Sequence, residues 1–212
     1  LQFELSKDFG RIAYTGNYFF NYPKGGGLNA RWFAGKFFYT GDKTSRKRGN
    51  TDPYQLNMST PKGYEDYTYG NYFMGRNEYN GFLSQQVMIR DGGFKVRTDL
   101  LSNKVGKTDD WLMALNFTST IHHNVPVKLF ADLGTYNGGW ADGYEQPKIL
   151  FDAGLQLSLC KDIFNVYVPL VYSKVYRDYF RSTPGNNFLQ RIAFSIDIQN
   201  INFKKISPLI PF

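Results

Sequence analysis

The stretch "ILFDAGLQLSLCKDIFNVYVPLVYSKV", which runs from Ile149 to Val175, decides the fold class. On its first arm, apolar residues such as Phe151 and Leu155 alternate with polar or small residues such as Asp152. The polar turn "CKDI" joins this arm to a second one that alternates in the same way. Period-two alternation indicates β-strands, so we predict a long hairpin. One face of this hairpin is apolar throughout, and it needs a large cover, which is either a second sheet or lipid.

The same alternation recurs along most of the chain and predicts about twelve strands. The expected strands lie at residues 1–7, 11–22, 28–40, 54–60, 67–76, 79–90, 93–101, 110–121, 126–135, 149–160, 163–175 and 188–199. We expect no helix of convincing length.

Strand length and loop rhythm favour lipid as the cover. Several expected strands, such as 28–40, are far longer than the average strand of a globular protein, which has about five or six residues. The links "HHNV" and "CKDI" are short, whereas "YNGGWADGYEQP" and "VYRDYFRSTPGNN" are long, which is typical of outer-membrane barrels. We therefore predict an all-β fold, an antiparallel up-and-down transmembrane β-barrel of about twelve strands or the C-terminal part of a larger barrel. The alternative is a soluble β-sandwich.

The composition supports one β-domain. Aromatic residues make up 18% of the 212 residues, and 21 glycines and 9 prolines favour strands and turns. We expect the barrel to span residues 1–200, followed by a C-terminal tail at 201–212. Because the chain opens on Leu1 without a targeting segment, we expect a mature or truncated piece of a longer protein.

The alternation assigns residues to two environments of the predicted barrel. The expected lipid-facing residues are Trp111, Met113, Leu115, Phe151, Leu155, Leu157, Val166, Val168, Leu170, Phe194 and Ile196. The expected lumen-lining residues are Arg31, Asn116, Lys128, Asp132, Asp152, Gln156, Arg191 and Asp197. Such a lumen is either a small pore or a plugged, structural interior.

A net charge of +7 indicates an anionic partner. The sharpest basic cluster is the loop "KTSRKRG", with Lys43, Arg46, Lys47 and Arg48, which we expect to contact lipid phosphates or another polyanion. The aromatic residues follow strand faces rather than gathering around this loop, so we do not expect a nucleic acid as a partner.

We predict no catalytic site and no cofactor in this chain. His122 and His123 are adjacent, and neighbouring side chains of an extended chain point to opposite faces, which suits one metal poorly. Asp142 and Glu145 lie in a Gly-rich stretch that we interpret as a surface loop. Cys160 ends an apolar strand and is expected to be a packing residue. No Ser-His-Asp, Cys-His or HExxH arrangement is present in the sequence.

Two blocks resemble a known family. The block "YGNYFMGRNEYNGFLSQQVMIRDGGFKVRTD" and the closing segments "FDAGLQLSLCKDIFNVYVPLVYSKVYRDYF" and "FLQRIAFSIDI" resemble the C-terminal outer-membrane β-region of Bacteroidetes M1-type metallopeptidases. The resemblance implies that a zinc peptidase domain precedes the β-region in the whole protein, and it transfers no zinc or catalytic residue to this chain. A second resemblance is to surface-antigen-like outer-membrane barrels.

These patterns predict an outer-membrane barrel that anchors or completes a larger assembly. Its expected partners are outer-membrane lipid, a preceding peptidase domain or other outer-membrane proteins. Two alternatives remain open at the level of sequence, a soluble β-sandwich that binds a polyanion or glycan and a small transport pore.

Overall fold

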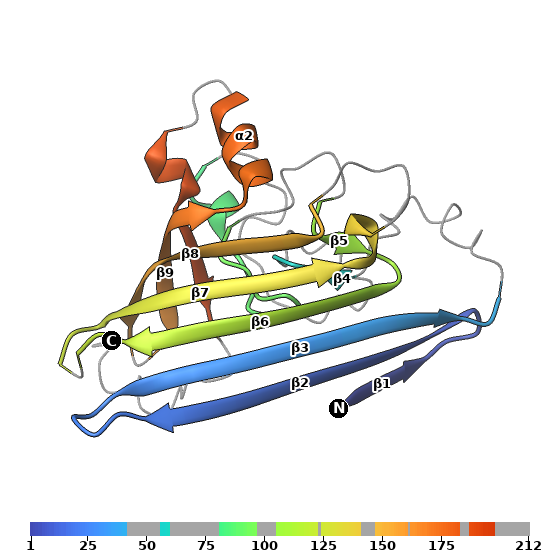
Figure 1. Ribbon diagram of the computed structural model, residues 1–212, viewed down its shortest axis with the longest axis horizontal. Helices are drawn as coiled ribbons and strands as arrows, with labels where there is room; N and C mark the ends of the chain where they lie inside the picture. The colour runs from blue at the N-terminus through green and yellow to red at the C-terminus, as the bar shows by residue number, and fades with distance from the viewer. Residues whose placement is uncertain are drawn as a thin grey trace, which may run out of the picture.

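The computed structural model describes residues 1–41, 56–59, 81–96, 105–122, 124–140, 147–160, 162–182 and 187–197. Its main element is one antiparallel sheet with the strand order β1-β2-β3-β6-β7-β8-β9-β10 (Figure 1). Chain neighbours in this sheet are also spatial neighbours, which is the up-and-down arrangement that the sequence predicts. No helix within the described residues is long and apolar enough to cross a membrane.

The strands of the main sheet are long at its centre and short at its edges. Their bounds are β1 Gln2–Leu5, β2 Phe9–Asn21, β3 Gly27–Tyr39, β6 Trp111–Thr120, β7 Val127–Tyr136, β8 Ile149–Leu159, β9 Phe164–Tyr172 and β10 Ala193–Ile196. A separate pair is formed by β4 Leu56–Asn57 and β5 Lys107–Thr108. The helical elements are α2 Lys174–Ser182 and the short turns η2 Leu83–Gln85, η3 Asn137–Gly139 and η4 Phe188–Arg191.

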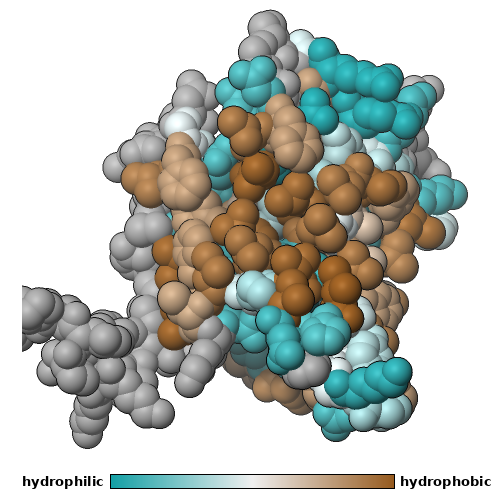
Figure 2. All heavy atoms as spheres, turned by 90° about the vertical axis from the view of Figure 1, so that its left-hand side faces the viewer, coloured by the Kyte–Doolittle hydropathy of each residue, from teal (hydrophilic) through white to brown (hydrophobic). Residues whose placement is uncertain are grey.

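The two faces of the main sheet differ in an unusual way. One face, which we call the covered face, lies beneath other parts of the chain, and it includes the buried Leu112, Asn116 and Asp132. The opposite face, which we call the open face, is apolar and exposed, as with Met113 (53% exposed) and Leu133 (44%). Figure 2 shows apolar residues gathered across the middle of one side of the molecule, with hydrophilic residues above and below. The covered face therefore holds buried charged residues as well as apolar ones, whereas the open face is apolar.

The cover of the inner side comes from segments between and after the long strands. Residues 91–96, the β4–β5 pair and α2 pack on the covered face. In Figure 1, α2 stands above β8. The covering segments form one apolar cluster at the end of the sheet nearest α2. Its buried members are Ala13, Phe33, Phe37, Leu56, Met58, Phe94, Val96, Val105, Leu112, Ala114, Tyr136, Leu150, Tyr176 and Phe180.

A bulge changes the facing of the residues at the end of β9. The β8–β9 register shifts between Ala153 and Gly154, so one extra residue enters β9 there. As a result, Tyr172 turns to the covered face and its ring meets the Phe180 ring edge-on, with centroids 5.4 Å apart. Uninterrupted alternation along the second arm of the predicted hairpin puts Tyr172 on the same face as Val166 and Val168, and this expectation is wrong because of the bulge.

The structure corrects other predictions. Residues 81–90 and 93–96 are not strands of the main sheet. Gln86 makes only an isolated parallel bridge to Phe194 at the β10 edge, and residues 91–96 cross the covered face. The expected strand at 163–175 ends at Tyr172 and continues into α2, so the prediction of no helix is wrong. Ten strands lie within the described residues, eight of them in the main sheet, and β1 and β10 do not pair with each other there. The expected strand at 67–76 and the tail at 201–212 lie outside the described residues.

The bulge gives a testable prediction for the fold. A methyl group at Gly154 would overlap the carbonyl oxygen of Val168, whereas one at Gly10 would find its nearest neighbour, Leu5 Cδ1, at 3.6 Å. We expect Gly154→Ala to lower the free energy of unfolding by about 1–3 kcal/mol, as overpacking does. Denaturant unfolding of both variants checks this, and equal midpoints for Gly154→Ala and the control Gly10→Ala would contradict it.

Candidate functional site

One row of polar side chains crosses the covered face. In the strand register, Arg31 is opposite Asn116, Asn116 is opposite Asp132, and Asp132 is opposite Asp152. The row thus takes one residue from each of β3, β6, β7 and β8. Such a row is unusual for a buried face, because charged side chains are almost never fully buried unless they are paired.

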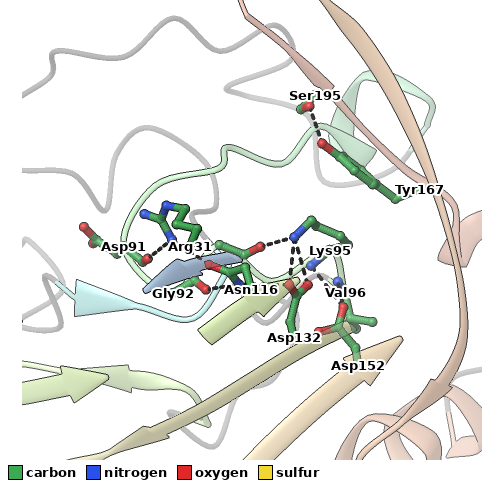
Figure 3. A network of polar contacts seen from close by, with 11 residues as sticks. Arg31, Asp91, Gly92, Lys95, Val96, Asn116, Asp132, Asp152, Tyr167 and Ser195 are labelled. Carbon is green, nitrogen blue, oxygen red and sulfur yellow. Dashed lines mark hydrogen bonds and ion pairs between the residues drawn. The ribbon is translucent and has the colours of Figure 1, made fainter. Parts of the chain in front are cut away.

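The segment Asp91–Val96 lies along this row and crosses the strands. Near β3, Arg31 Nη1 donates to the Asp91 carbonyl oxygen (2.9 Å) and to Asn116 Oδ1 (2.7 Å). Near β6, Asn116 Nδ2 donates to the Gly92 carbonyl oxygen (2.8 Å) and to Asp132 Oδ1 (2.9 Å). Figure 3 shows these contacts in sequence from Asp91 to Val96. The row therefore binds the backbone of a chain segment that makes no ladder with these strands.

Lys95 is the centre of the network. Its Nζ lies 2.9 Å from both carboxylate oxygens of Asp132 and donates to the Gly93 carbonyl oxygen at 2.7 Å. The Lys95 and Asp132 side chains are 4% and 0% exposed, so the ion pair is shielded from solvent. Asp152 Oδ2 accepts hydrogen bonds from the backbone N–H groups of Lys95 and Val96, both at 3.0 Å. Two buried carboxyl groups thus share one ammonium group and two amide donors.

The network extends to the edge of the sheet through Arg11. The Arg11 side chain is 2% exposed, and its guanidinium lies 2.9 Å from Glu4 and 3.3 Å from Asp91. Asp91 has a positive φ of 41°, which lets its side chain reach Arg11 while its carbonyl oxygen reaches Arg31. Two arginines on neighbouring strands therefore hold the same turn of the covering segment.

Gly93 is required where the covering segment is closest to the row. Its φ is +67°, and a Cβ there would lie 2.8 Å from Asn116 Oδ1 and 3.0 Å from Arg31 Nη1. Only glycine combines this backbone conformation with so little room. The sequence "DGG" is therefore part of the network rather than the hairpin turn that the sequence predicts.

A second polar cluster lies beyond Lys95 on the covered face. Tyr167 and Ser195 share a hydrogen bond of 2.8 Å between their hydroxyl groups, and Lys95 Nζ lies 5.8 Å from the Tyr167 ring centroid. Next to it, Gln156 donates to Asn165 Oδ1 at 2.9 Å. Apart from Lys95, these residues come from β8, β9 and β10. Toward β10, the buried polar residues therefore interact through hydrogen bonds between uncharged groups and not through ion pairs.

Three expected lumen-lining residues lie away from the network. Lys128 pairs with Asp162 of the β8–β9 turn at 2.6 Å. Partial burial pushes the pKa of Asp162 upward, but hydrogen bonds from Lys128 and Ser158 and the Lys128 charge outweigh it and lower that pKa overall. Arg191 lies on η4 at the sheet end, and Asp197 follows β10 and donates its backbone N–H to Ile163. The assignment of all eight residues to a lumen stays a prediction.

Most of the expected lipid-facing residues lie on the open face. Met113, Leu115, Phe151 and Leu170 are exposed there, and Trp111, Leu155, Leu157, Val166, Val168 and Ile196 are half-buried. Phe194 is the exception at 1% exposure. It pairs with Val166 as the alternation requires, but the Phe82 ring stacks on it at 4.7 Å between centroids. The prediction that Phe194 contacts lipid is wrong for this reason.

The remaining candidate residues form no site. Within the described residues, no group of three or more His, Cys, Asp or Glu side chains is arranged to hold a metal ion. Cys160 is exposed in the β8–β9 turn with a φ of 52°, so the prediction that it packs in the core is wrong. His122 is exposed in the β6–β7 turn. His123, the pair Asp142 and Glu145, and the basic loop residues Lys43, Arg46, Lys47 and Arg48 lie outside the described residues.

Comparison of the chain with protein-family models, with curated protein sequences and with solved structures gives no match. The site must therefore be interpreted from its own geometry. Within the described residues, that geometry contains no paired nucleophile and base, and most of its donors and acceptors bond to one another, except Arg11 Nε and Asp152 Oδ1, which have no hydrogen-bond partner. What it can do is fix residues 91–96 to four strands of the sheet.

Lys95 provides the test of the network. We expect Lys95→Met to lower the free energy of unfolding by about 3–5 kcal/mol, because it leaves buried carboxylates without their cation. The matched control is Lys128→Met, which breaks an ion pair in which Asp162 is 59% exposed and which should cost about 0–1 kcal/mol. Denaturant midpoints measure both changes.

A second substitution separates charge from packing. Adding Asp132→Asn to Lys95→Met removes the orphaned negative charge, so the double variant should recover part of the lost stability. If the loss of unfolding free energy in the double variant equals the sum of the losses in the two single variants, the ion pair is not the source of the effect.

Proposed function

We propose that this chain is part of an outer-membrane β-barrel that anchors or completes a larger assembly. The observation that carries the proposal is the contrast between the two faces of the sheet. The covered face contains a buried ion network, and the open face exposes apolar side chains along its strands. In water, such a sheet exposes a large apolar surface, and patches of that kind mark contact with lipid or with another protein. Lipid satisfies the open face over all of its strands at once.

The dimensions of the strands support the proposal. β2 and β3 have 13 residues each, and β6 to β9 have 9 to 11, whereas a tilted membrane-spanning strand needs about 9–11. Aromatic side chains such as Tyr18 (60% exposed) and Phe38 (49%) lie near opposite ends of the open face. This placement matches the aromatic girdles of outer-membrane barrels.

The open face also has grooves between its side chains. Two of them, of about 370 and 520 Å³, are lined by residues such as Leu129, Ala131, Leu155, Met113 and Leu133. Their walls are almost entirely apolar, which suits hydrocarbon chains better than water or a polar ligand.

Anchoring is the role that the covered face favours. The ion network and the apolar cluster fill this face with side chains of the same chain, which leaves little of it for cargo. The eight-stranded sheet does not close within the described residues, so closure into a barrel is part of the proposal. The resemblance to the β-region of Bacteroidetes M1-type metallopeptidases suggests a zinc peptidase as the anchored domain.

Arginine on the open face tests the proposal directly. In water, an arginine at an exposed position such as Met113 or Leu133 should change stability by about 0.5 kcal/mol or less. Against lipid, the same substitution should cost about 2–4 kcal/mol. We therefore expect Met113→Arg and Leu133→Arg to lower sharply the yield of folded, heat-modifiable protein in membranes.

The control and the alternative use the same measurement. Ser6→Arg, in an exposed turn outside the long strands, should leave the yield unchanged. If Met113→Arg and Leu133→Arg instead give a protein that folds and stays in solution without detergent, the open face meets water and the β-sandwich takes the place of the barrel.

The turns give a prediction for orientation. We expect the short β6–β7 and β8–β9 turns in the periplasm and the long links after β7 and β9 outside, as in outer-membrane barrels. In intact cells, a membrane-impermeant maleimide should therefore not label the exposed native Cys160. In a Cys160→Ser background it should label Ser182→Cys, at the exposed end of α2. Labelling of both positions without permeabilisation would exclude this arrangement.

A further inference from the structure

Helix α2 carries its positive charges on one face. Lys174, Arg177 and Arg181 are spaced three and four residues apart, which places them side by side on a helix surface. All three are exposed, and within the described residues none lies in an ion pair. Asp178 is the one acidic residue of the helix, so this face has a clear positive excess.

The opposite face of α2 fixes the helix to the sheet. Tyr176 and Phe180 are 1% and 6% exposed in the apolar cluster, and burial raises the pKa of the Tyr176 phenol well above its usual value. Arg191 of η4 lies over the Phe180 ring at 5.3 Å and donates to the Tyr172 hydroxyl oxygen at 3.0 Å. The end of β9, α2 and η4 are therefore one connected unit, and the cationic face is presented in a fixed direction.

Exposed apolar side chains flank this unit. Leu170 and Val171 at the end of β9 are 55% and 59% exposed, and Phe188 and Leu189 of η4 are 51% and 70% exposed. Ala193 of β10 is opposite Tyr167 of β9 in antiparallel register, so η4 returns beside the end of β9. We call these four residues together with Lys174, Arg177 and Arg181 the rim patch. In Figure 1, α2 stands above the ends of β8 and β9.

We propose that the rim patch binds the phosphate-bearing headgroups of anionic lipids where the sheet leaves the membrane. Guanidinium and ammonium groups pair with phosphate oxygens, and Arg does so with two parallel hydrogen bonds. The flanking apolar side chains enter the boundary between headgroups and acyl chains, as in amphipathic interfacial helices. This inference rests on the proposed function, because it takes the open face as the lipid-facing side.

The apolar half of the patch favours lipid over an acidic protein segment as the partner. Leu170 and Val171 extend the apolar open face to the end of β9, and Lys174 follows Val171 by three residues, so the apolar surface and the cationic helix are neighbours along the chain. A lipid offers the same adjacency between its acyl chains and its headgroup. An acidic peptide would match the three cations only.

Lipid selectivity in vesicles tests the inference. The 212-residue chain is reconstituted in phosphatidylcholine, and its association with spin-labelled phosphatidylglycerol is compared with that of spin-labelled phosphatidylcholine. We expect a preference for phosphatidylglycerol that Arg177→Gln/Arg181→Gln lowers by roughly five- to twenty-fold, since each cation contributes about a factor of five at an anionic surface. The control Lys7→Gln/Lys24→Gln removes two exposed cations elsewhere and should keep the preference.

The outcomes separate this inference from the proposed function. A wild-type chain that does not enter phosphatidylcholine vesicles contradicts the barrel itself. A chain that enters them but shows the same selectivity in both double variants contradicts only the rim patch. Millimolar inorganic phosphate at constant ionic strength should leave the preference intact, and its loss would indicate an anion site instead of a headgroup surface. Heat-modifiability of each variant confirms that it is folded.

Discussion

Buried charge is the constraint on which the rest of this structure depends. Arg31, Asp132 and Asp152 lie on one face of a sheet that is covered, and each would be costly there without partners. The partners come from the segment around Lys95, which supplies one ammonium group, two amide donors and two carbonyl acceptors. The sheet therefore fixes the position of residues 91–96, and these residues provide the partners for its buried polar groups. Neither is stable in this arrangement without the other.

The same constraint determines what the opposite face must meet. The covered positions of the alternation hold the polar row and the apolar cluster, so the other apolar residues of the same strands point outward. The two-stranded pair β4–β5 does not cover the open face, because Leu56 and the adjacent Met58 pack on the covered face. Met113, Leu115, Leu129 and Leu133 are exposed together on the open face, and in the proposed barrel a bilayer would cover them along the strands.

Much of the fold follows from the sequence, and the part that does not has a physical reason. Strict alternation predicts β2, β3 and β6 to β9 and divides their residues correctly between two faces apart from the end of β9. Arg31, Asn116, Asp132 and Asp152 could therefore be assigned to the side opposite the apolar face. Their alignment in one row could not be predicted, because it depends on register across four strands. Lys95 was placed in an expected strand, since "FKV" alternates as a strand does. The only local signal for its true role is the adjacent "DGG", which allows the chain to lie close to Arg31 and Asn116.

The ends of the strands show where alternation stops being informative. The bulge at Gly154 reverses the facing of Tyr172, and the next residues form a helix whose period differs from that of the strand before it. Read with a period of 3.6, "KVYRDYFRS" separates Tyr176 and Phe180 from Lys174, Arg177 and Arg181, so its two faces match the apolar cluster and an aqueous or headgroup surface. The change of period thus occurs where the chain leaves the sheet. Two-residue alternation keeps apolar residues on the open face and the ion network on the covered face, and it ends where β9 passes beyond both.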